Sequence, residues 1–238
     1  MIRALTFDVV GTLIDFESGI LRCVRSFDAP DDGSVLAAFG AAEDVVQRLS
    51  PELPFPAMLD PISTRLAAEL GIPELEGSPS PLRRSLPSWP AFPDAAEVLG
   101  RWRERFRLVA LTNADRAAVE AWGPVLGHPF HDAVTVDEVG VNKPDPRMFR
   151  AALDKLAAVG IARDEVLHVA QSQYHDIGAA HALGLRTAWV ERRHGQAGSG
   201  ATPVAATVTR PDLHVHSLAE LEERLEGADA LLGGRAAG

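Results

Sequence analysis

The sequence is short of the residues that form disulfide frameworks and sulfur-rich metal sites. It contains one cysteine, Cys23, in 238 residues, which excludes a disulfide within the chain and a cysteine cluster for zinc. Lysine is scarce as well, because Lys143 and Lys155 are the two lysines among 23 basic residues. In a chain that otherwise uses arginine, Lys143 at a predicted strand end indicates a position where a compact ammonium group is needed.

Long apolar runs and a basic surface are also missing. No apolar stretch approaches the ~20 residues of a membrane span, and the first residues show no secretory signal pattern. The formal net charge of −10 argues against nucleic acid as a partner, since nucleic-acid binders usually carry a basic face. We therefore expect a cytoplasmic globular protein with no membrane or nucleic-acid partner. A small anionic substrate stays open, because local charge can oppose net charge.

Short apolar runs alternate with helical patterns along most of the chain. This alternation predicts an α/β fold with a doubly wound parallel sheet and helices on both faces. Helical patterns follow the runs near Pro93, Pro144 and Ile177, and glycines end two of them. The strand-like runs cover residues 4–7, 108–112, 133–136, 166–170 and 187–190.

The alternation is interrupted between the first two runs. Residues 34–49 and 58–70 show helical patterns without a strand, and residues 72–93 are rich in proline and serine. An insertion of this kind predicts a helical cap over one edge of the sheet. We expect a core of residues 1–15 and 91–226, a cap of residues 16–90, and a flexible Ala- and Gly-rich tail of residues 227–238.

Polar side chains follow four of the predicted strands. Asp8 ends the first run and is followed by Gly11 and Thr12, where glycine permits a tight turn. Thr112 and Asn113 end the second run. The other two groups are Lys143 and the stretch that ends at Asp176. Since the carboxyl ends of parallel strands meet at one crevice, we expect these side chains to form one site.

Each group has a chemical role available in such a site. Asp8 could act as a nucleophile that forms a covalent ester or an acyl phosphate. Lys143 could pair with Asp8 and keep it ionised, and Asp176 could hold Lys143 or orient a hydrolytic water. Thr112 and Asn113 could donate hydrogen bonds to a substrate carboxylate.

Structural roles compete with these assignments. Thr112, Asn113 and Asp176 are also common helix-capping residue types, and His175 is either a water-activating base or a hydrogen-bonded loop residue. The histidines show no spacing typical of metal ligands, so no metal site is expected from them. These histidines are His128, His131, His168, His175 and His181.

Together the four groups resemble the motifs of the haloacid dehalogenase superfamily over nearly the whole chain. Residues 7–13, Phe-Asp-Val-Val-Gly-Thr-Leu, are similar to its first motif, and Leu-Thr-Asn at 111–113 to its second. Lys-Pro-Asp-Pro at 143–146 is similar to the third motif and residues 168–177 to the fourth. The resemblance implies a Rossmann-like core with a cap, and Asp8 as the nucleophile.

Two departures select a branch of this superfamily. Its phosphatases carry a second Asp two residues after the nucleophile, where this chain has Val10. They also carry an acidic Mg²⁺ ligand in the fourth motif, where this chain has Gln171. The L-2-haloacid dehalogenases, which lack the second Asp, resemble this chain better. They imply a metal-independent and cofactor-free hydrolase that displaces a leaving group from the α-carbon of a 2-substituted carboxylic acid through an ester on Asp8.

The resemblance leaves the leaving group open between a halide and the nitrogen of a strained ring. Those dehalogenases receive the halide with a cap arginine, and no motif selects among Arg22, Arg25, Arg48 and Arg65. They also usually carry an aromatic residue at the place of Val10. Whether the chain forms a homodimer is open as well. The expected catalytic residues are Asp8, Lys143, Asp176, Thr112 and Asn113, and the expected substrate-binding residues are Val9, Val10, Thr12, Trp89, Tyr174 and His175.

Two other functions compete with this one. The first is a Mg²⁺-dependent phosphatase or phosphonate hydrolase, whose metal would lie at Asp8, Val10 and Asp176. The second is a non-catalytic binding protein that keeps the fold.

Overall fold

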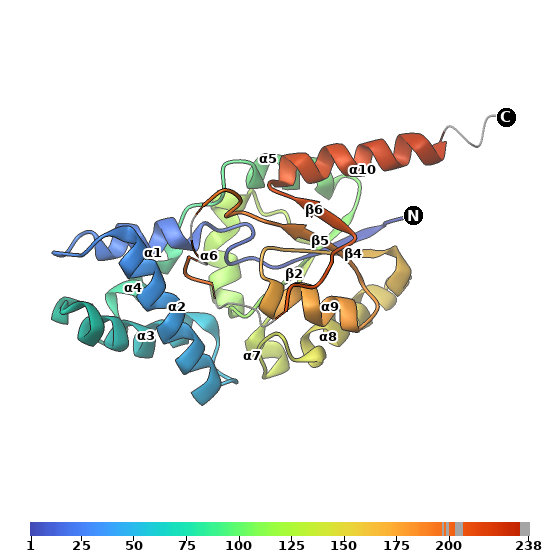
Figure 1. Cartoon of the computed structure of the whole chain (residues 1–238). Coiled ribbons are helices and arrows are strands. Elements are labelled where there is room, and N and C mark those ends of the chain that lie inside the picture. Colours follow the sequence, from blue (N-terminus) through green and yellow to red (C-terminus); the bar gives the residue numbers. More distant parts are fainter. Residues whose placement is uncertain (197, 199, 203–206, 234–238) are drawn as a thin grey trace.

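A parallel sheet of six strands forms the centre of the protein. The structure is a computed structural model, and it describes residues 1–196, 198, 200–202 and 207–233. The strand order is β3-β2-β1-β4-β5-β6, so the first strand is central and the chain winds outward in both directions (Figure 1). The strands are β1 (Ala4–Phe7), β2 (Arg107–Leu111), β3 (Asp132–Val134), β4 (Val166–Ala170), β5 (Arg186–Val190) and β6 (Leu213–Val215). All five adjacent pairs are parallel, which confirms the predicted fold class.

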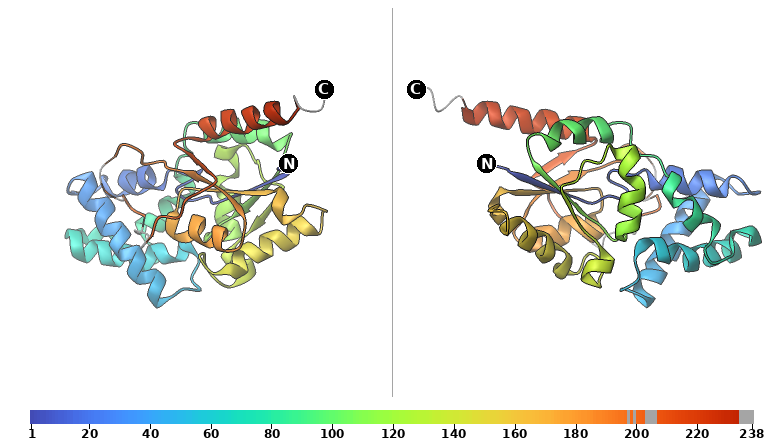
Figure 2. Two further views of the ribbon diagram at one scale, coloured as in Figure 1. Left: turned by 45° about the vertical axis from the view of Figure 1, so that its right-hand side comes forward. Right: turned by 180° about the vertical axis from the view of Figure 1, so that it is seen from behind.

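Helices cover both faces of this sheet, as a doubly wound fold requires (Figure 2). One face carries α5 (Ala95–Arg103), α6 (Arg116–Leu126) and α10 (Leu218–Gly233). The other carries α7 (Val136–Val139), α8 (Pro146–Ala157) and α9 (Gly178–Ala182). Helix α8 is typical, since Met148, Phe149, Ala152 and Leu156 recur at helical spacing and are all buried against the sheet.

A group of helices between β1 and β2 lies beyond the carboxyl ends of the strands (Figure 1). It consists of α1 (Phe16–Val24), α2 (Asp32–Leu49), α3 (Phe55–Leu70) and α4 (Pro81–Ser85), with the short 3-10 helices η1 (Pro73–Leu75) and η2 (Leu86–Ser88). Helices α2 and α3 pack on each other, and α1 and α4 close the group. These helices occupy the segment 16–90 that we predict to be a cap, and we refer to them as the cap helices.

The sheet edge and the C-terminal helix extend beyond the sequence-based expectations. The sequence does not predict strand β6, because its three residues place His214 between two apolar side chains and give too short a pattern. Helix α10 continues to Gly233, through the first part of the segment 227–238 where we expected a tail. The rest of that segment lies outside the described residues.

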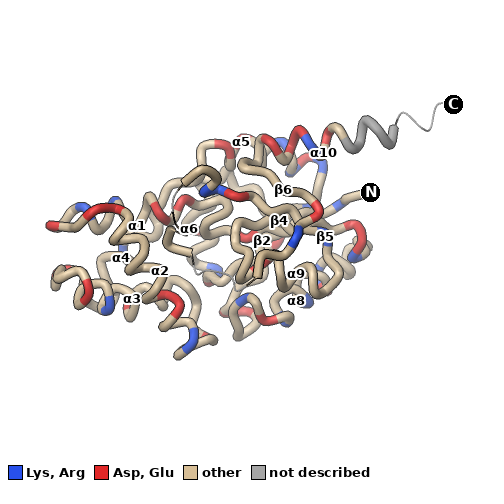
Figure 3. The backbone as a smooth tube through the Cα atoms, viewed as in Figure 1, with Lys and Arg blue, Asp and Glu red and all other residues tan. Residues whose placement is uncertain are grey.

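Charged residues of both signs are interspersed along the chain (Figure 3). Among the residues described, both acidic and basic positions occur on the cap helices and on the helices of the core. Within the same residues, no helix combines the length and the apolar character that crossing a membrane would require.

Candidate active site

Asp8 stands at the carboxyl end of the central strand. Its backbone N–H donates to the carbonyl of Val169 at 3.1 Å, so the pairing of β1 with β4 ends at this residue. The chain then turns back, with the N–H groups of Leu13 and Ile14 both donating to the carbonyl of Val9 at 2.9 Å. Gly11 adopts φ +89° within this turn, a conformation that favours glycine. The turn holds the Asp8 carboxylate at the edge of the sheet with 6% of the residue exposed.

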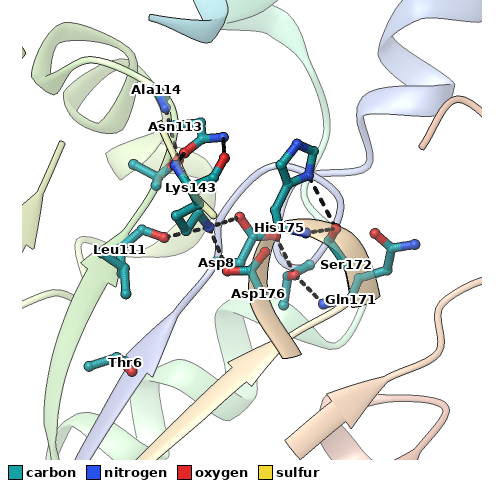
Figure 4. Close-up of polar contacts among 12 residues, drawn as sticks. Thr6, Asp8, Leu111, Asn113, Ala114, Lys143, Gln171, Ser172, His175 and Asp176 are labelled. Atoms are coloured by element: carbon teal, nitrogen blue, oxygen red, sulfur yellow. Dashed lines mark hydrogen bonds and ion pairs between the residues drawn. The ribbon is translucent and has the colours of Figure 1, made fainter. Parts of the chain in front are cut away.

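Lys143 connects two carboxylates below the surface (Figure 4). Its Nζ donates to Asp8 Oδ1 at 2.8 Å, to Asp176 Oδ1 at 2.7 Å and to the carbonyl of Leu111 at 2.9 Å. An ammonium group has three N–H donors, so these three acceptors satisfy it completely. Lys143 is 1% exposed, which makes it a fixed, dry cation between Asp8 and Asp176.

The second oxygen of Asp8 is held by Thr12. The Thr12 hydroxyl donates to Asp8 Oδ2 at 2.6 Å and accepts from the backbone N–H of Gln171 at 2.8 Å. Because the N–H of Gln171 occupies a lone pair of the Thr12 oxygen, the hydroxyl hydrogen of Thr12 points at Asp8. Both oxygens of Asp8 thus receive a donor, which fixes the carboxylate in one orientation.

Asp176 continues the polar network into the interior of the sheet. Its Oδ1 also lies 3.0 Å from His168 Nε2, and His168 Nδ1 lies 2.9 Å from the Thr6 hydroxyl. Asp176 Oδ2 is buried and has no hydrogen-bond partner within the described residues. A buried carboxylate oxygen without a donor is costly, so this atom is available to a substrate or to a water.

The three charged groups shift one another's protonation. Burial raises the pKa of Asp8 above its ordinary value, with Asp176 acting in the same direction and Lys143 and Thr12 opposing it. Burial would also raise the pKa of Asp176, but Lys143 and His168 lower it to about 2. Burial alone would lower the pKa of Lys143, but the two carboxylates raise it. Lys143 therefore stays charged, and Asp8 is the carboxylate that takes up a proton first on acidification.

Asn113 holds the loop that carries Lys143, and Thr112 makes a local contact at the end of β2. The backbone N–H of Lys143 donates to Asn113 Oδ1 at 2.6 Å, and Asn113 Nδ2 donates to the carbonyl of Lys143 at 3.2 Å. The Thr112 hydroxyl accepts the N–H of Ala114 at 3.1 Å. Both residues line the cavity beside Asp8, so this structural role is compatible with contact to a substrate.

A small cavity of about 40 Å³ lies between the strand ends and the cap helices. A single water needs roughly 10–15 Å³ measured in this way, so the cavity suits a ligand of few heavy atoms. The sequence-predicted residues that line it are Asp8, Val10, Thr112, Asn113, Lys143, His175 and Asp176. Thr12 lies behind this lining and contacts Asp8.

Three other sequence-predicted residues lie elsewhere. Val9 is fully buried in the hydrophobic core. Trp89 is 1% exposed and packs edge-on against Phe55 and close to Gly19. Tyr174 is 38% exposed and lines a neighbouring depression. The structure therefore does not bring these three side chains into the cavity that contains Asp8.

His175 joins the core to the cap helices. Its Nε2 lies 2.8 Å from Gln47 Oε1 on α2, and its Nδ1 lies 3.2 Å from the Ser172 hydroxyl. Burial lowers the pKa of His175 to about 4, with Lys143 acting in the same direction and Asp176 opposing it. The imidazole is therefore neutral near pH 7.

The sequence-based reasoning missed three residues from the cap side of the cavity: Phe16, Glu43 and Phe55. Phe16 and Phe55 are apolar residues at helix starts, where no pattern marks them. Glu43 carried a signal, because the apolar face of α2 runs through Leu36, Phe39 and Val46, and Glu43 falls on the same face. A charged residue at a buried position of an amphipathic helix is a reason to look for a function.

The four cap arginines considered for a halide site are all solvent-exposed: Arg22, Arg25, Arg48 and Arg65. Arg25 forms an ion pair with Asp32, and Arg48 pairs with Asp44 at 2.6 Å. Among the described residues, no arginine lines the cavity beside Asp8. The cation in that lining is Lys143, and its three donors are already used.

The side chains around Asp8 fit a divalent cation poorly. Such an ion needs several free oxygen ligands. Asp8 and Asp176 instead share one ammonium, and the amide of Gln171 stands where the phosphatases described above carry an acidic ligand. Within the described residues, a group of three potential metal-binding side chains does occur, at Glu191, His194 and His216 on the β5–β6 edge. None of the three lines the cavity beside Asp8.

Comparison with known proteins gives one family and two kinds of relative. Residues 2–184 match the family model of haloacid dehalogenase-like hydrolases. A phosphoserine phosphatase of Thermus thermophilus is 35% identical over 56% of this chain, but the match spans half of that protein's length. An (S)-2-haloacid dehalogenase 4A of Burkholderia cepacia is 27% identical over 81% of this chain and 84% of its own.

The solved structures support the same fold. An L-2-haloacid dehalogenase from Xanthobacter autotrophicus with chloropropionic acid covalently bound superposes with a TM-score of 0.73. It is 22% identical, and the match covers 95% of this chain and 99% of that one. The likeness therefore extends over both the sheet and the cap helices.

Proposed function

Since the chain belongs to the haloacid dehalogenase-like hydrolases, we propose that it hydrolyses small 2-substituted carboxylic acids by displacing a leaving group from the α-carbon. Support for the substrate class comes from the relatives matched over most of their length, which are 2-haloacid dehalogenases. The single observation that carries the proposal is the Asp8 carboxylate, held by Lys143 and Thr12 at the edge of a small cavity beside Val10.

In the first step, an oxygen of Asp8 attacks the α-carbon of the acid. A carbon–oxygen bond forms, the bond to the leaving group breaks, and its electron pair goes to the leaving group. The product of this step is an ester on Asp8. Lys143 favours ionised Asp8 before the attack and remains beside the ester carbonyl afterwards.

In the second step, a water attacks the carboxyl carbon of the Asp8 ester. The acyl–oxygen bond breaks, the 2-hydroxy acid leaves with one proton of the water, the second proton is released, and Asp8 returns as a carboxylate. We assign the orientation of this water to Asp176 Oδ2, the buried oxygen without a partner. The ammonium of Lys143 stabilises the negative charge that develops on the carboxyl oxygen during this step.

Val10 favours this chemistry over phosphate transfer. A phosphatase of this family needs a proton donor two residues after the nucleophile, and Val10 has no ionisable group. Asn113 lines the cavity, and we assign the second N–H of its amide, beyond the one that is donated to the Lys143 carbonyl, to the carboxylate of an acid substrate.

The ester route is tested by a single turnover in ¹⁸O-water with enzyme in excess over 2-chloropropionate. Because the water attacks the Asp8 carboxyl group, mass spectrometry should find one ¹⁸O in the peptide that contains Asp8. The 2-hydroxypropionate of that first turnover should be unlabelled. Label that enters the product directly in the first turnover would contradict an ester on Asp8.

We expect turnover to survive removal of divalent metal. Dialysis against EDTA should change kcat/KM by less than about twofold, because Lys143 already supplies the positive charge beside Asp8. The measurement is the initial rate before and after chelation, with Mg²⁺ added back. Activity that disappears with EDTA and returns with Mg²⁺ would instead support the phosphatase or phosphonate-hydrolase alternative.

Thr12→Val should weaken the nucleophile without removing it. The substitution takes a donor from Asp8 Oδ2 and leaves the N–H of Gln171 unsatisfied, so kcat should fall about tenfold. Because the lost donor favoured the charged form, the pKa of Asp8 should rise further and the acid limb of the kcat/KM profile should move to higher pH. Thr12→Ser keeps the hydroxyl and should restore both values; an unmoved acid limb in Thr12→Val would refute the role of this donor.

A further inference from the structure

Glu43 is a buried acid that the proposed reaction does not yet use. It lies on α2, is 8% exposed, and lines the same cavity as Asp8. Asp8 comes from the sheet and Glu43 from the cap helices, so the two carboxyl groups approach the cavity from different parts of the fold. Displacement at carbon needs one group that attacks the carbon and a second group that stabilises the leaving group as it departs.

The charged neighbours of Glu43 disfavour its ionised form. The titratable residues that share the cavity with it are Asp8, Lys143, His175 and Asp176. The Lys143 donors are all engaged elsewhere, and His175 is neutral near pH 7. On its own helix the nearest acid, Asp44, pairs with exposed Arg48 at the surface.

These surroundings keep a proton on Glu43. Burial, followed by the negative charges of Asp8 and Asp44, raises the pKa of Glu43 to about 8. Near pH 7 the side chain is a neutral carboxylic acid, which can donate a proton into the cavity. The two other carboxyl groups in the lining are poorer proton donors. Asp8 accepts hydrogen bonds at both oxygens, and the pKa of Asp176 is lowered to about 2, so Asp176 is ionised near pH 7.

We propose that Glu43 is the general acid for the leaving group, and that the natural substrates are 2-substituted acids whose departing atom is an oxygen or nitrogen that must take up a proton. The proposal rests on the proposed displacement by Asp8 and specifies its leaving group. A halide leaves without a proton and would be served better by a cation, which this side of the cavity lacks among the described residues. A basic oxygen or nitrogen leaves slowly unless an acid protonates it as the bond breaks.

The proton balance closes over one turnover. As Asp8 attacks the α-carbon, the carbon–heteroatom bond breaks, and the heteroatom takes its electron pair and the Glu43 proton. Glu43 is left as a carboxylate. Hydrolysis of the Asp8 ester then releases one proton in excess of that carried by the 2-hydroxy product, and this proton restores neutral Glu43.

Two small acids separate this role from the nucleophilic step. With 2-chloropropionate, chloride leaves without a proton; with oxirane-2-carboxylate, ring opening at the α-carbon leaves an alkoxide that must be protonated. In Glu43→Gln, which keeps the shape of the neutral acid but cannot give a proton, kcat on the oxirane should fall about 10²-fold or more. The loss on 2-chloropropionate should be at least about tenfold smaller.

The outcomes distinguish the two levels of the proposal. If wild type turns over 2-chloropropionate but not the oxirane, or if Glu43→Gln slows both equally, Glu43 is not a general acid and the displacement by Asp8 stands. If wild type turns over neither compound, the proposed function fails and Glu43 loses its role with it. Glu52→Gln, an exposed acid in the cap segment, is the matched control and should leave both rates unchanged.

A second readout does not depend on turnover. Because the pKa of Glu43 is raised, the folded protein keeps a proton that the unfolded chain releases above pH 4.5. The contribution of this proton to stability is therefore lost as the pH rises from 4.5 to about 8. Relative to Glu43→Gln, wild type should therefore lose roughly 3 °C or more of Tm between pH 5 and pH 8. Parallel Tm profiles of the two proteins would show that Glu43 is already ionised and would overturn the proposal.

Discussion

Asp8→Asn is expected to abolish turnover while leaving the fold intact. The amide has nearly the shape of the carboxylate but cannot attack carbon, so kcat should fall by roughly 10⁴-fold or more, as for other enzymes that lose a nucleophile. The measurement is release of the 2-hydroxy acid by enzyme at high concentration. Residual activity must be compared with the mass of the peptide that contains residue 8, because deamidation of Asn to Asp would restore the nucleophile.

The same substitution should not destabilise the protein. Asp8, Asp176 and Lys143 place two negative charges and one positive charge in a dry environment, which leaves one excess negative charge. Burial has raised the pKa of Asp8, so its ionised form costs stability near pH 7. We therefore expect the Tm of Asp8→Asn at pH 7 to equal or exceed that of wild type. A large loss of Tm would mean that Asp8 is mainly structural, and turnover by a fully amidated variant would exclude it as the nucleophile.

The strand ends of the core were the part of the site that the sequence could predict. Asp8 and Thr112 directly follow β1 and β2, and parallel strands bring their carboxyl ends to one edge of the sheet. That geometric rule needs no knowledge of side-chain packing. Lys143 does not follow a strand directly, as the sequence suggested, because helix α7 lies between β3 and the loop that carries it. The loop nevertheless places Lys143 within hydrogen-bonding distance of Asp8, 135 positions away in the chain.

The cap side of the cavity could not be predicted in the same way. Helical periodicity shows which face of α2 is buried but not what that face packs against, so Glu43 gave no indication that it would face Asp8. Trp89 is the opposite case, because the sequence predicts it as a substrate-binding residue and the structure places it away from the cavity. Its place in the proline-rich return to the core suggested a cavity wall, but a large indole buries more apolar surface in the core. There it packs on Gly19, where an added Cβ would lie 2.4 Å from the indole ring.

Buried polar residues inside strands were also difficult to interpret. His168 lies in a strand of five buried residues, and its Nε2 lies within hydrogen-bonding distance of Asp176 Oδ1. Periodicity treats such a residue as one more interior position, and its partner Thr6 lies on a different strand, 162 positions away. Networks of this kind depend on strand register, which the sequence pattern of a fully buried parallel sheet does not specify.

Lys143→Met should produce the largest combined loss of activity and stability. Methionine fills most of the same volume but removes the donor to Asp8, Asp176 and the Leu111 carbonyl, so two buried carboxylates would face each other without a cation. Breaking a buried ion pair from one side typically costs 3–5 kcal/mol, and we expect a loss of about this size in the free energy of unfolding at pH 7.5. Turnover should fall about 10³-fold, because one of the carboxylates will hold a proton.

Lys155→Met is a matched control, because Lys155 is the other lysine and also contacts three acceptors. Its Nζ lies 3.1 Å from Asp132, 2.8 Å from the Ala133 carbonyl and 2.8 Å from Glu138. Lys155 is half-buried rather than enclosed, and its partners are 33% and 36% exposed, so water can replace the lost donor. We expect a cost of about 1 kcal/mol or less and no change in turnover.

The pH dependence separates a lost cation from a simple packing defect. Without Lys143, burial and mutual repulsion should raise the pKa of Asp8 or Asp176 far above the unfolded value, so the folded state takes up a proton. Stability then falls as pH rises from the unfolded pKa to the raised one, and the deficit of Lys143→Met should be smaller at pH 5 than at pH 7.5. Urea unfolding of both variants at the two pH values measures this. A deficit independent of pH would show that Lys143 contributes through its aliphatic chain rather than through its charge.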